Sequence, residues 1–469
     1  MIWSGIDIFF REGLGFIFTV VLARLLLPED FGTLALLGLF LAIANVFVNA
    51  GFTAALIRMQ DASILDESTV FWFNLCASLL AALGLCLAAP WIAEFLALEV
   101  LYPLTMLMAV NVVIGSLGAI QSTLFTKGLD FRTPMRVGAI ATITSGVVGV
   151  SLAFSGYGVW SLAWQAVTST VVSTSLLWYF SSWRPVAGFS RDSFRRMFSF
   201  GGWVFASNML EAIYQRGYTV LVGKMYGIYD LGIYKQADNM QLFPASILTR
   251  ILSQVSFPVF SSASHDKTRL KRWVRLSVRS AMLVCAPTMV GLGILAEPII
   301  GMVFGSKWLP AAPVLQVLCF IGLFWPLHVI NLNVLQAQGH SRLNFRLSIA
   351  KKTTGIALLL IGSLFGVMGV AWSRVIQSVI ALVINGLYSK KLLDYSMWEQ
   401  IKDCLSSLVL SVVMAGVVVL CEGRLEIGGL SELLALVFIG FSFYLVSNLL
   451  LGASAFKDAY SFLRNGSAS

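Results

Sequence analysis

Apolar runs of about 20 residues recur from one end of the chain to the other, and short polar breaks separate them. A helix needs about 20 apolar residues to cross a bilayer, because every backbone N–H and C=O must be bonded within the segment. The pattern therefore predicts an all-α polytopic membrane protein of about 14 transmembrane helices. The expected spans are 3–26, 33–57, 69–91, 101–122, 136–156, 158–180, 199–222, 239–261, 276–300, 312–334, 347–366, 369–389, 404–421 and 431–452.

The basic residues gather on one side of this helix pattern. Cytoplasmic segments of membrane proteins carry an excess of Lys and Arg. If the N-terminus is cytoplasmic, most of the 32 Lys and Arg residues fall in cytoplasmic segments or in helices. The outside segments then hold Arg24, Lys224, Lys235, Lys307 and Arg424. The charge pattern therefore predicts that both termini lie in the cytoplasm.

Two of the polar breaks share a sequence pattern. Residues 21–32 read VLARLLLPEDFG and residues 221–232 read LVGKMYGIYDLG. The matched positions are Arg24 with Lys224, Asp30 with Asp230, and Gly32 with Gly232. The offset of 200 residues spans six expected helices, so both halves would have the same orientation, as in the parallel repeats of alternating-access transporters. The alternative is that Asp-x-Gly is merely common turn chemistry.

This repeat predicts the domain organisation. Each half would form a lobe of six helices, and the last two helices would be an addition to the repeat. The expected parts are an N-terminal lobe at 1–181, a C-terminal lobe at 199–389, an extra helix pair at 403–452 and a cytoplasmic tail at 453–469. No connection is longer than about 20 residues, which leaves no room for a soluble catalytic domain. We therefore expect that the chain is not an enzyme.

The composition agrees with a chain that lies in lipid. Hydrophobic residues make up 58% and charged residues 12% of the chain, about half the charge of a soluble domain. The net charge of +9 is placed in short loops between apolar runs and does not indicate nucleic acid. The six cysteines lack CxxC spacing, and the three histidines are far apart in sequence. We therefore expect no metal site and no cofactor.

Charged and amide side chains occur inside the first two expected helices, where exposure to lipid is costly. The first helix carries Asp7, Arg11 and Glu12, and the second carries Asn45 and Asn49. Asp7 and Arg11 are four positions apart, as are Asn45 and Asn49, so each pair shares a helix face. Residues of this kind normally line a cavity or pair with one another.

The seventh and eighth expected helices carry similar polar stripes. Their members are Asn208, Glu211, Gln215 and Arg216 in the seventh helix, and Ser246, Arg250 and Gln254 in the eighth. The helices that carry the stripes are therefore the ones that flank the two matching turns. From this pattern we infer a water-filled cavity lined by the first two helices of each half.

Two interpretations of the charges in these stripes remain open. Arg250 has no acid within one turn, which favours it as a ligand for an anionic substrate. The alternative for the other charges is structural pairing, because buried ion pairs often serve the specificity of packing. Such pairs would join Asp7 to Arg11 and Glu211 to Arg216.

Four further residues lie in or beside expected helices. Arg275 and Arg279, at the cytoplasmic start of the ninth helix, are expected to be snorkelling anchors, with a lipid-phosphate contact as the alternative. Arg374, near the outer end of the twelfth helix, allows a structural or a functional role. His328 lies on an otherwise apolar face and is expected to be a core histidine with its hydrogen bonds satisfied.

Several short motifs follow one another over residues 3–330. They are LARLLLPEDFG, GFTAALIR, DESTVFWFNL, LDFR, GYGVWSLAWQ, WRPVAGFS, LGIYKQADNMQLFP, VSFPVFS and FGSKWLPAAPVLQVL. In their order and spacing they resemble the polysaccharide-transporter branch of the multidrug/oligosaccharidyl-lipid/polysaccharide (MOP) exporter superfamily. Within it, the similarity is to Wzx-type flippases of the colanic-acid and teichuronic-acid exporter kind, and it continues more loosely to the end of the chain.

The resemblance implies a bacterial inner-membrane protein that flips undecaprenyl-diphosphate-linked oligosaccharide units for surface polysaccharides such as lipopolysaccharide or exopolysaccharide. It implies two six-helix lobes around a cationic cavity and alternating access driven by a proton or sodium gradient. Arg11, Arg216 and Arg250 stand where the bases of such a cavity would lie. The implied partners are the lipid-linked oligosaccharide, membrane lipids, and the polymerase and export proteins of the same pathway.

In this interpretation the polar stripes meet a charged lipid substrate. A diphosphate cannot cross hydrocarbon unaided, and guanidinium groups bind phosphate oxygens in a fork. Amide side chains can bond sugar hydroxyls, and the expected ones are Asn45, Asn49, Asn208, Gln215 and Gln254. Glu12 and Glu211, desolvated near arginines, are the candidates for ion coupling.

Three rival functions remain. A multidrug antiporter of the same superfamily would need unpaired acids for cationic drugs, whereas bases equal or outnumber acids in these stripes. A membrane-embedded polymerase or ligase would need a long extramembrane loop. A lipid II flippase is a close neighbour that the sequence alone does not separate from a polysaccharide flippase.

Overall fold

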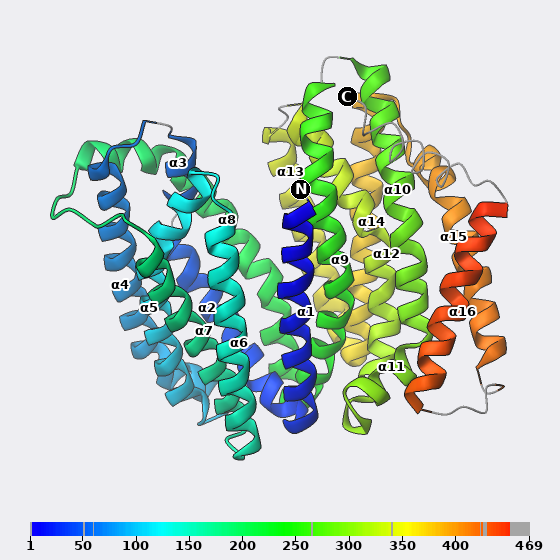
Figure 1. Ribbon diagram of the computed structural model, residues 1–469, viewed down its shortest axis with the longest axis horizontal. Coiled ribbons are helices and arrows are strands. Elements are labelled where there is room, and N and C mark those ends of the chain that lie inside the picture. The colour runs from blue at the N-terminus through cyan, green and yellow to red at the C-terminus, as the bar shows by residue number, and fades with distance from the viewer. Residues whose placement is uncertain are drawn as a thin grey trace. The chain divides into compact units, whose positions relative to one another are not determined.

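The computed structural model describes residues 2–49, 52–59, 61–263, 266–338, 341–422, 424 and 429–450. These residues form helices joined by short connections, and no strand occurs among them. The chain divides into two compact units, Met1–Gly232 and Ile233–Ser469. Figure 1 shows the long helices of each unit packed side by side.

The first unit is built from helices that pack largely with their neighbours in sequence. Its described helices are α1 (Ile2–Leu25), α2 (Pro28–Asn49), α3 (Phe52–Arg58), α4 (Ile64–Leu96), α5 (Leu101–Lys127), α6 (Arg132–Phe154), α7 (Val159–Phe180) and α8 (Arg191–Tyr226). Helices α4 and α5 pack together, as do α6 and α7, because their short connections favour neighbouring placement. Helix α8 leaves this order and packs against α2.

The second unit begins within a continuous helix. Its described elements are α9 (Ile228–Ser262), α10 (Lys267–Ile294), α11 (Ala296–Val303), η1 (Ser306–Trp308), α12 (Ala311–Ala337), α13 (Ser341–Gly362), η2 (Ser363–Phe365), α14 (Gly366–Leu393), α15 (Met397–Cys421) and α16 (Gly429–Leu450). Helix α10 packs against both α12 and α15, and α14 packs against α12 and α13. The last pair, α15 and α16, pack on each other.

The helices agree closely with the apolar pattern of the sequence. Each expected span overlaps one of the long helices, so the all-α membrane fold is confirmed. Two spans are divided, 33–57 into α2 and α3, and 276–300 into α10 and α11. Nine segments of the described residues are long and apolar enough to cross a membrane. The number of crossings itself stays a prediction.

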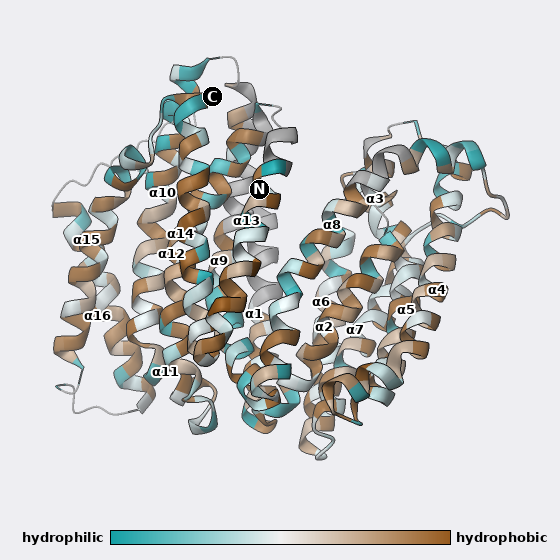
Figure 2. Cartoon of the chain, turned by 180° about the vertical axis from the view of Figure 1, so that it is seen from behind, coloured by the Kyte–Doolittle hydropathy of each residue, from teal (hydrophilic) through white to brown (hydrophobic). Residues whose placement is uncertain are grey.

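Polar residues define where several helices begin. Ser63 and Asp66 form a capping box at the start of α4, in which the Ser63 hydroxyl accepts from the Asp66 N–H and Asp66 accepts from the Ser63 N–H. Ser396 and Glu399 repeat this arrangement at the start of α15. Such caps satisfy N–H groups that the helix itself leaves unbonded. Figure 2 shows the resulting distribution, with hydrophobic residues along the helices and hydrophilic residues gathered toward their ends.

The outer face of α4 is suited to lipid. Leu80, Leu83, Leu87 and Trp91 follow one another at helical spacing and are exposed, and Leu80 and Trp91 are each 70% exposed. In water, a contiguous apolar face of this kind would be a liability. Against hydrocarbon it costs nothing, which agrees with a helix that crosses the membrane.

The two matching turns of the sequence touch each other within the first unit. A side chain at Gly32 would overlap the backbone carbonyl of Ile228, and a side chain at Gly232 would overlap the backbone carbonyl of Pro28. Positions 28 and 228 are separated by the same 200 residues as the two glycines. The starts of α2 and α9 therefore cross in a reciprocal backbone contact that only glycine allows.

Candidate functional site

An exposed polar strip runs along α8, the helix that packs against α2. Asn208, Glu211 and Gln215 are all exposed on it. The Gln215 Nε2 atom donates a hydrogen bond to Glu211 Oε1 at 2.8 Å. The stripe expected from the sequence is therefore present, and two of its members are bonded to each other.

Arg216 lies at the junction of α8 and α2. Its side chain is exposed, and its Nη1 atom lies 3.9 Å from the place where a side chain would begin at Gly38 of α2. Within the described part of the chain Arg216 makes no ion pair, so the pairing with Glu211 that the sequence left open is not formed. The Arg216 guanidinium thus lies beside Gly38 of α2, and no carboxylate of the described residues forms an ion pair with it.

The two asparagines of α2 are also exposed. Asn45 Nδ2 donates to the Leu41 carbonyl at 2.8 Å, and Asn49 Nδ2 donates to the Asn45 carbonyl at 2.9 Å. Each bond uses one of the two amide N–H groups and leaves the amide oxygen as an acceptor. The α2–α8 face, which we define as Asn45, Asn49, Asn208, Glu211, Gln215 and Arg216, brings six predicted site residues onto two packed helices.

The remaining predicted site residues lie on α1 and α9. Their backbone is helical, but the side chains of Arg11, Glu12, Arg250 and Gln254 lie outside the described residues. Ser246 of the same α9 stripe donates its hydroxyl to the Phe243 carbonyl at 2.9 Å.

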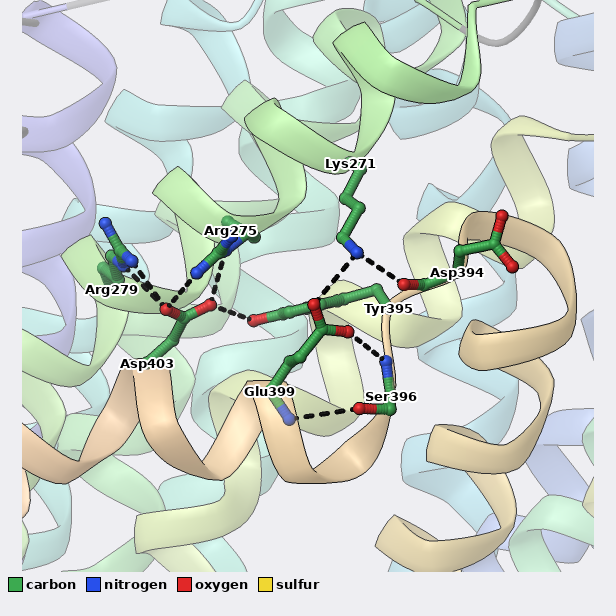
Figure 3. A network of polar contacts seen from close by, with 8 residues as sticks. All are labelled: Lys271, Arg275, Arg279, Asp394, Tyr395, Ser396, Glu399 and Asp403. Carbon is green, nitrogen blue, oxygen red and sulfur yellow. Dashed lines mark hydrogen bonds and ion pairs between the residues drawn. The ribbon is translucent and has the colours of Figure 1, made fainter.

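Arg275 and Arg279 of α10 bind a carboxylate that the sequence interpretation did not consider (Figure 3). Arg275 donates to both oxygens of Asp403 at 2.8 Å, and Arg279 donates to Asp403 Oδ1 at 2.6 and 3.0 Å. The Asp403 side chain, on α15, is only 3% exposed. The expectation that these arginines are snorkelling anchors or lipid-phosphate ligands is therefore wrong, because both guanidinium groups are used to hold α15 on α10.

Tyr395 and Lys271 add further contacts between α15 and its neighbours. We call the whole group, with Arg275, Arg279, Glu399 and Asp403, the α10–α15 clamp. The Tyr395 hydroxyl donates to Asp403 Oδ2 at 2.8 Å, and Lys271 pairs with Glu399 at 3.0 Å and bonds the Asp394 carbonyl. Burial, and after it the negative charge of Asp403, raises the pKa of Tyr395, which lies in the connection between α14 and α15. The phenol therefore keeps its proton and remains a donor.

A second buried carboxylate joins α9 to α14. Asp238, whose side chain is 2% exposed, pairs with Lys235 at 2.9 Å and with Arg374 at 2.9 Å. Arg374 also donates to the hydroxyl of the fully buried Tyr234 at 3.1 Å. Of the two roles left open for Arg374, the structure supports the structural one.

His328 of α12 is hydrogen-bonded at both ring nitrogens, as expected. Its Nε2 lies 2.9 Å from the Ser378 hydroxyl, and its Nδ1 lies 3.3 Å from Asn385 Nδ2. Three cysteines, Cys285, Cys319 and Cys404, are buried as free thiols. Among the described residues, no three His, Cys, Asp or Glu side chains come together in a way that could hold a metal ion.

The sequence interpretation missed both carboxylates that organise the second unit. Asp403 lies 128 residues from Arg275, and Asp238 lies 136 residues from Arg374. A usable signal existed, since each is an acid near the end of a long apolar run, where an unpaired charge is costly. What the sequence could not supply is the identity of the partner helix.

Two family models match the chain. The model described as "Polysaccharide biosynthesis protein" matches residues 21–313, which is more than half of the chain. The model described as "Lipid II flippase MurJ" matches residues 230–439.

Curated relatives carry names from polysaccharide synthesis. The succinoglycan biosynthesis transport protein ExoT of Rhizobium meliloti is 30% identical over 67% of this chain and 64% of its own length. The teichuronic acid biosynthesis protein TuaB of Bacillus subtilis is 28% identical over 73% of this chain and 71% of its own length. This chain thus aligns with just under two thirds of the succinoglycan transport protein.

Solved structures share the fold. The inward closed conformation of the lipid II flippase MurJ superposes with a TM-score of 0.81 at 19% identity, covering 96% of this chain and 99% of that one. An inward-facing multidrug resistance transporter of the MATE family, described as a member of the MOP superfamily, gives a TM-score of 0.65 at 15% identity over 82% of this chain and 94% of its own. The chain therefore belongs to the polysaccharide biosynthesis protein family, and it shares its fold with these transporters.

Proposed function

We propose that this protein is a flippase that moves lipid-linked oligosaccharide units from the cytoplasmic to the outer leaflet of the bacterial inner membrane, for surface polysaccharide synthesis. The names of the relatives support this proposal, since they come from succinoglycan, teichuronic acid and lipopolysaccharide biosynthesis. The match to a flippase model and the MurJ-like fold support the transport of a lipid-linked substrate.

The observation that carries the proposal is the exposed Arg216 guanidinium on the α2–α8 face, with which no acid among the described residues forms an ion pair. A cation at membrane depth without an acid beside it is costly, and it is retained where it meets an anionic ligand. Its fork of N–H donors suits the oxygens of a diphosphate. The exposed amides of Asn45 and Asn208, which belong to the same α2–α8 face, suit sugar hydroxyls.

The mechanism follows from the chemistry of the substrate. The diphosphate and the sugars need a polar path, because charge in hydrocarbon is prohibitive. We propose that Arg11, Arg216 and Arg250 bind the diphosphate, and that Asn45, Asn49, Asn208, Gln215 and Gln254 bind the sugars. The prenyl tail can remain in lipid throughout, since it gains nothing from entering a polar site.

Coupling and organisation complete the proposal. Glu12 and Glu211 are the proposed carboxylates for a coupling proton or sodium ion. Two six-helix lobes, 1–181 and 199–389, would expose the substrate residues to the two leaflets in turn. The helix pair 403–452 and the tail 453–469 lie outside this repeat, both termini would be cytoplasmic, and polymerase and export proteins of the pathway are the proposed partners.

A lipid II flippase is the second candidate, because the MurJ structure covers nearly the whole chain. An antiporter of cationic drugs is the remaining alternative, and a drug-resistance assay on expression would separate it from a flippase. Proteoliposome assays with the two kinds of lipid, a diphosphate-linked oligosaccharide and lipid II, separate the two flippase functions.

The decisive experiment replaces Arg216. Purified Arg216→Ala protein is reconstituted with a fluorescent polyprenyl-diphosphate oligosaccharide, and flipping is followed by loss of access to a reagent added outside. A charge-assisted hydrogen bond contributes about 1.5–3 kcal/mol, so we expect roughly a tenfold or greater loss of rate. The thermal stability should be unchanged, because the Arg216 side chain is exposed and unpaired.

Arg195→Ala is the matched control. Arg195 is an exposed arginine near the start of the same helix and is not part of the α2–α8 face. It should flip the lipid at the wild-type rate. A normal rate in Arg216→Ala would remove Arg216 from the mechanism. Arg250→Ala, which we expect to abolish flipping, would then test the α9 stripe by itself.

A further inference from the structure

The outward face of α15 changes its chemistry near the start of the helix. Leu405, Val409 and Val412 follow one another at helical spacing and are exposed, as expected for a helix surface that faces lipid. Lys402 and Trp398 extend the same spacing toward the start of α15, and both are exposed. We call these five residues the outward stripe of α15. The stripe is therefore apolar along the helix and ends in a cation and an indole, about one turn apart.

The two acids within one turn of Lys402 are both bound to other groups. Glu399 pairs with Lys271 at 3.0 Å, and Asp403 accepts hydrogen bonds from the other donors of the α10–α15 clamp. Figure 3 shows both carboxylates turned toward α10. Among the residues that the structure describes, Lys402 forms no ion pair and Trp398 forms no hydrogen bond. The clamp thus uses the nearby acids for packing and leaves none of them for the Lys402 ammonium.

The position of Lys402 in its helix does not compensate its charge either. Lys390 and Lys391 lie in the last turn of α14, where a cation suits the partial negative charge of the helix C-terminus. Lys402 lies near the start of α15, where this favourable interaction is absent. Its flexible stem lets the ammonium reach the polar headgroups while the methylene groups stay against lipid. An anion of the membrane surface is therefore the counter-charge that this position suits.

Further exposed cations gather at the same end of the second unit. Lys271 bonds the Asp394 carbonyl, so the start of α10 lies beside the connection between α14 and α15. The exposed acids of these segments are Asp266, which caps α10, and Asp394. The exposed cations are more numerous, namely Lys267, Arg269, Arg272, Lys390, Lys391 and Lys402. A surface with this excess of positive charge attracts anionic lipids over zwitterionic ones.

We propose that Trp398 and Lys402 form a binding site for an anionic phospholipid of the surrounding membrane. The phosphate accepts hydrogen bonds from Lys402 Nζ and from the indole N–H of Trp398, and an acyl chain lies along the apolar part of the outward stripe. One helical turn rises about 5.4 Å. The headgroup layer is roughly 5–7 Å thick on each side of the hydrocarbon core, so both residues fit within it. The inference requires only that α15 crosses the membrane, and it does not depend on which substrate is transported.

Native mass spectrometry of the full-length protein tests this site. The detergent-purified protein receives equal amounts of phosphatidylglycerol and phosphatidylcholine with the same acyl chains, and the ratio of the two is measured for the first lipid bound. The wild-type protein should favour phosphatidylglycerol. Lys402→Gln should lower the ratio by about fivefold, which is the contribution of one lysine at an anionic membrane surface. Trp398→Phe keeps an aromatic ring but loses the donor, so it should weaken binding of both lipids by similar factors.

Lys267→Gln is the matched control, because Lys267 lies among exposed polar residues in the first turn of α10 and on no apolar stripe. It should keep the wild-type ratio within about twofold. Without added lipid, Lys402→Gln should have the melting temperature of the wild-type protein, since the side chain is exposed and pairs with no described acid.

Two results would overturn the inference. The first is a lipid ratio in Lys402→Gln equal to that of the wild-type protein, which would mean that other cations select the lipid. The second is a polyprenyl phosphate that replaces phosphatidylglycerol in the wild-type protein but not in Lys402→Gln. The site would then belong to a lipid-linked phosphate rather than to a phospholipid of the membrane.

Discussion

Helix junctions in the two units are held together by different means. In the first, α2 crosses α9 through Gly32 and Gly232, and a side chain at Gly223 of α8 would overlap the Leu36 side chain of α2. In the second, Asp403 ties α10 to α15 and Asp238 ties α9 to α14. Close packing at glycine does at the α2–α8–α9 junction what ion pairs do between α9 and α14 and between α10 and α15.

This difference explains why charge is available in one place and not in the other. The cations of the second unit at Arg275, Arg279 and Arg374 are bound to buried carboxylates, and removing them would loosen the fold. Where glycine contacts hold α2, α8 and α9, Arg216 forms no ion pair with the described residues, which leaves its donors available for the anionic ligand that we propose. In a transporter of anions, the binding site can therefore be sought at helix junctions that are packed by glycine and that also carry arginine.

The largest expected effect is that of Asp403→Asn on stability. The change leaves two guanidinium groups at a site where the carboxylate was 3% exposed, and breaking such a buried pair costs about 3–5 kcal/mol. Thermal unfolding of the detergent-purified protein measures the loss. The Arg216→Ala variant, by contrast, should flip the lipid slowly but keep the melting temperature of the wild-type protein.

Glu422→Gln is the control for this change. Glu422 is an exposed acid at the other end of α15, and its replacement should alter stability by less than about 0.5 kcal/mol. If Asp403→Asn had the same melting temperature as the wild-type protein, the clamp would not hold α15 on α10. The contrast between glycine packing and ion pairing would then fail.

The next effect concerns the glycine crossing. In Gly32→Ala and Gly232→Ala the new methyl group would overlap a backbone carbonyl, which cannot rotate away as a side chain can. Overpacking of this kind costs about 1–3 kcal/mol. Because the contact is reciprocal, the two variants should lose similar amounts, as measured by thermal unfolding, and both should flip lipid more slowly.

Gly84→Ala on α4 is the matched control, since nothing lies within 4 Å of the place where its side chain would begin. It should be neutral or slightly stabilising, because alanine is the better helix former. A tolerated Gly232→Ala beside a damaging Gly32→Ala would show that the two turns are not equivalent, and would remove the structural support for the repeat.

The apolar pattern predicted the helices well because membrane crossing constrains length and composition directly. It placed the start of α8 at 199, whereas the helix begins at Arg191, since Ser190 caps a polar first turn that no apolar pattern reveals. Polar stripes were found because spacing along one helix is visible in sequence. The partner of Arg275 could not be predicted from the sequence, because the packing of α10 on α15 is what brings Asp403 to it.

The smallest effect, and the sharpest test of the clamp, is that of Tyr395→Phe. The phenol is one of the donors to Asp403, and losing a hydrogen bond of this kind costs about 1 kcal/mol. The pKa of Tyr395 is raised in the folded protein, so its stabilising effect is complete below the unfolded value of about 10 and is lost as the pH rises toward the folded value. Melting curves between about pH 8 and 11 should therefore fall less steeply for Tyr395→Phe than for wild type. Tyr179→Phe, at an exposed tyrosine near the end of α7, should keep the wild-type slope, and equal slopes in all three proteins would mean that the phenol does not donate to Asp403.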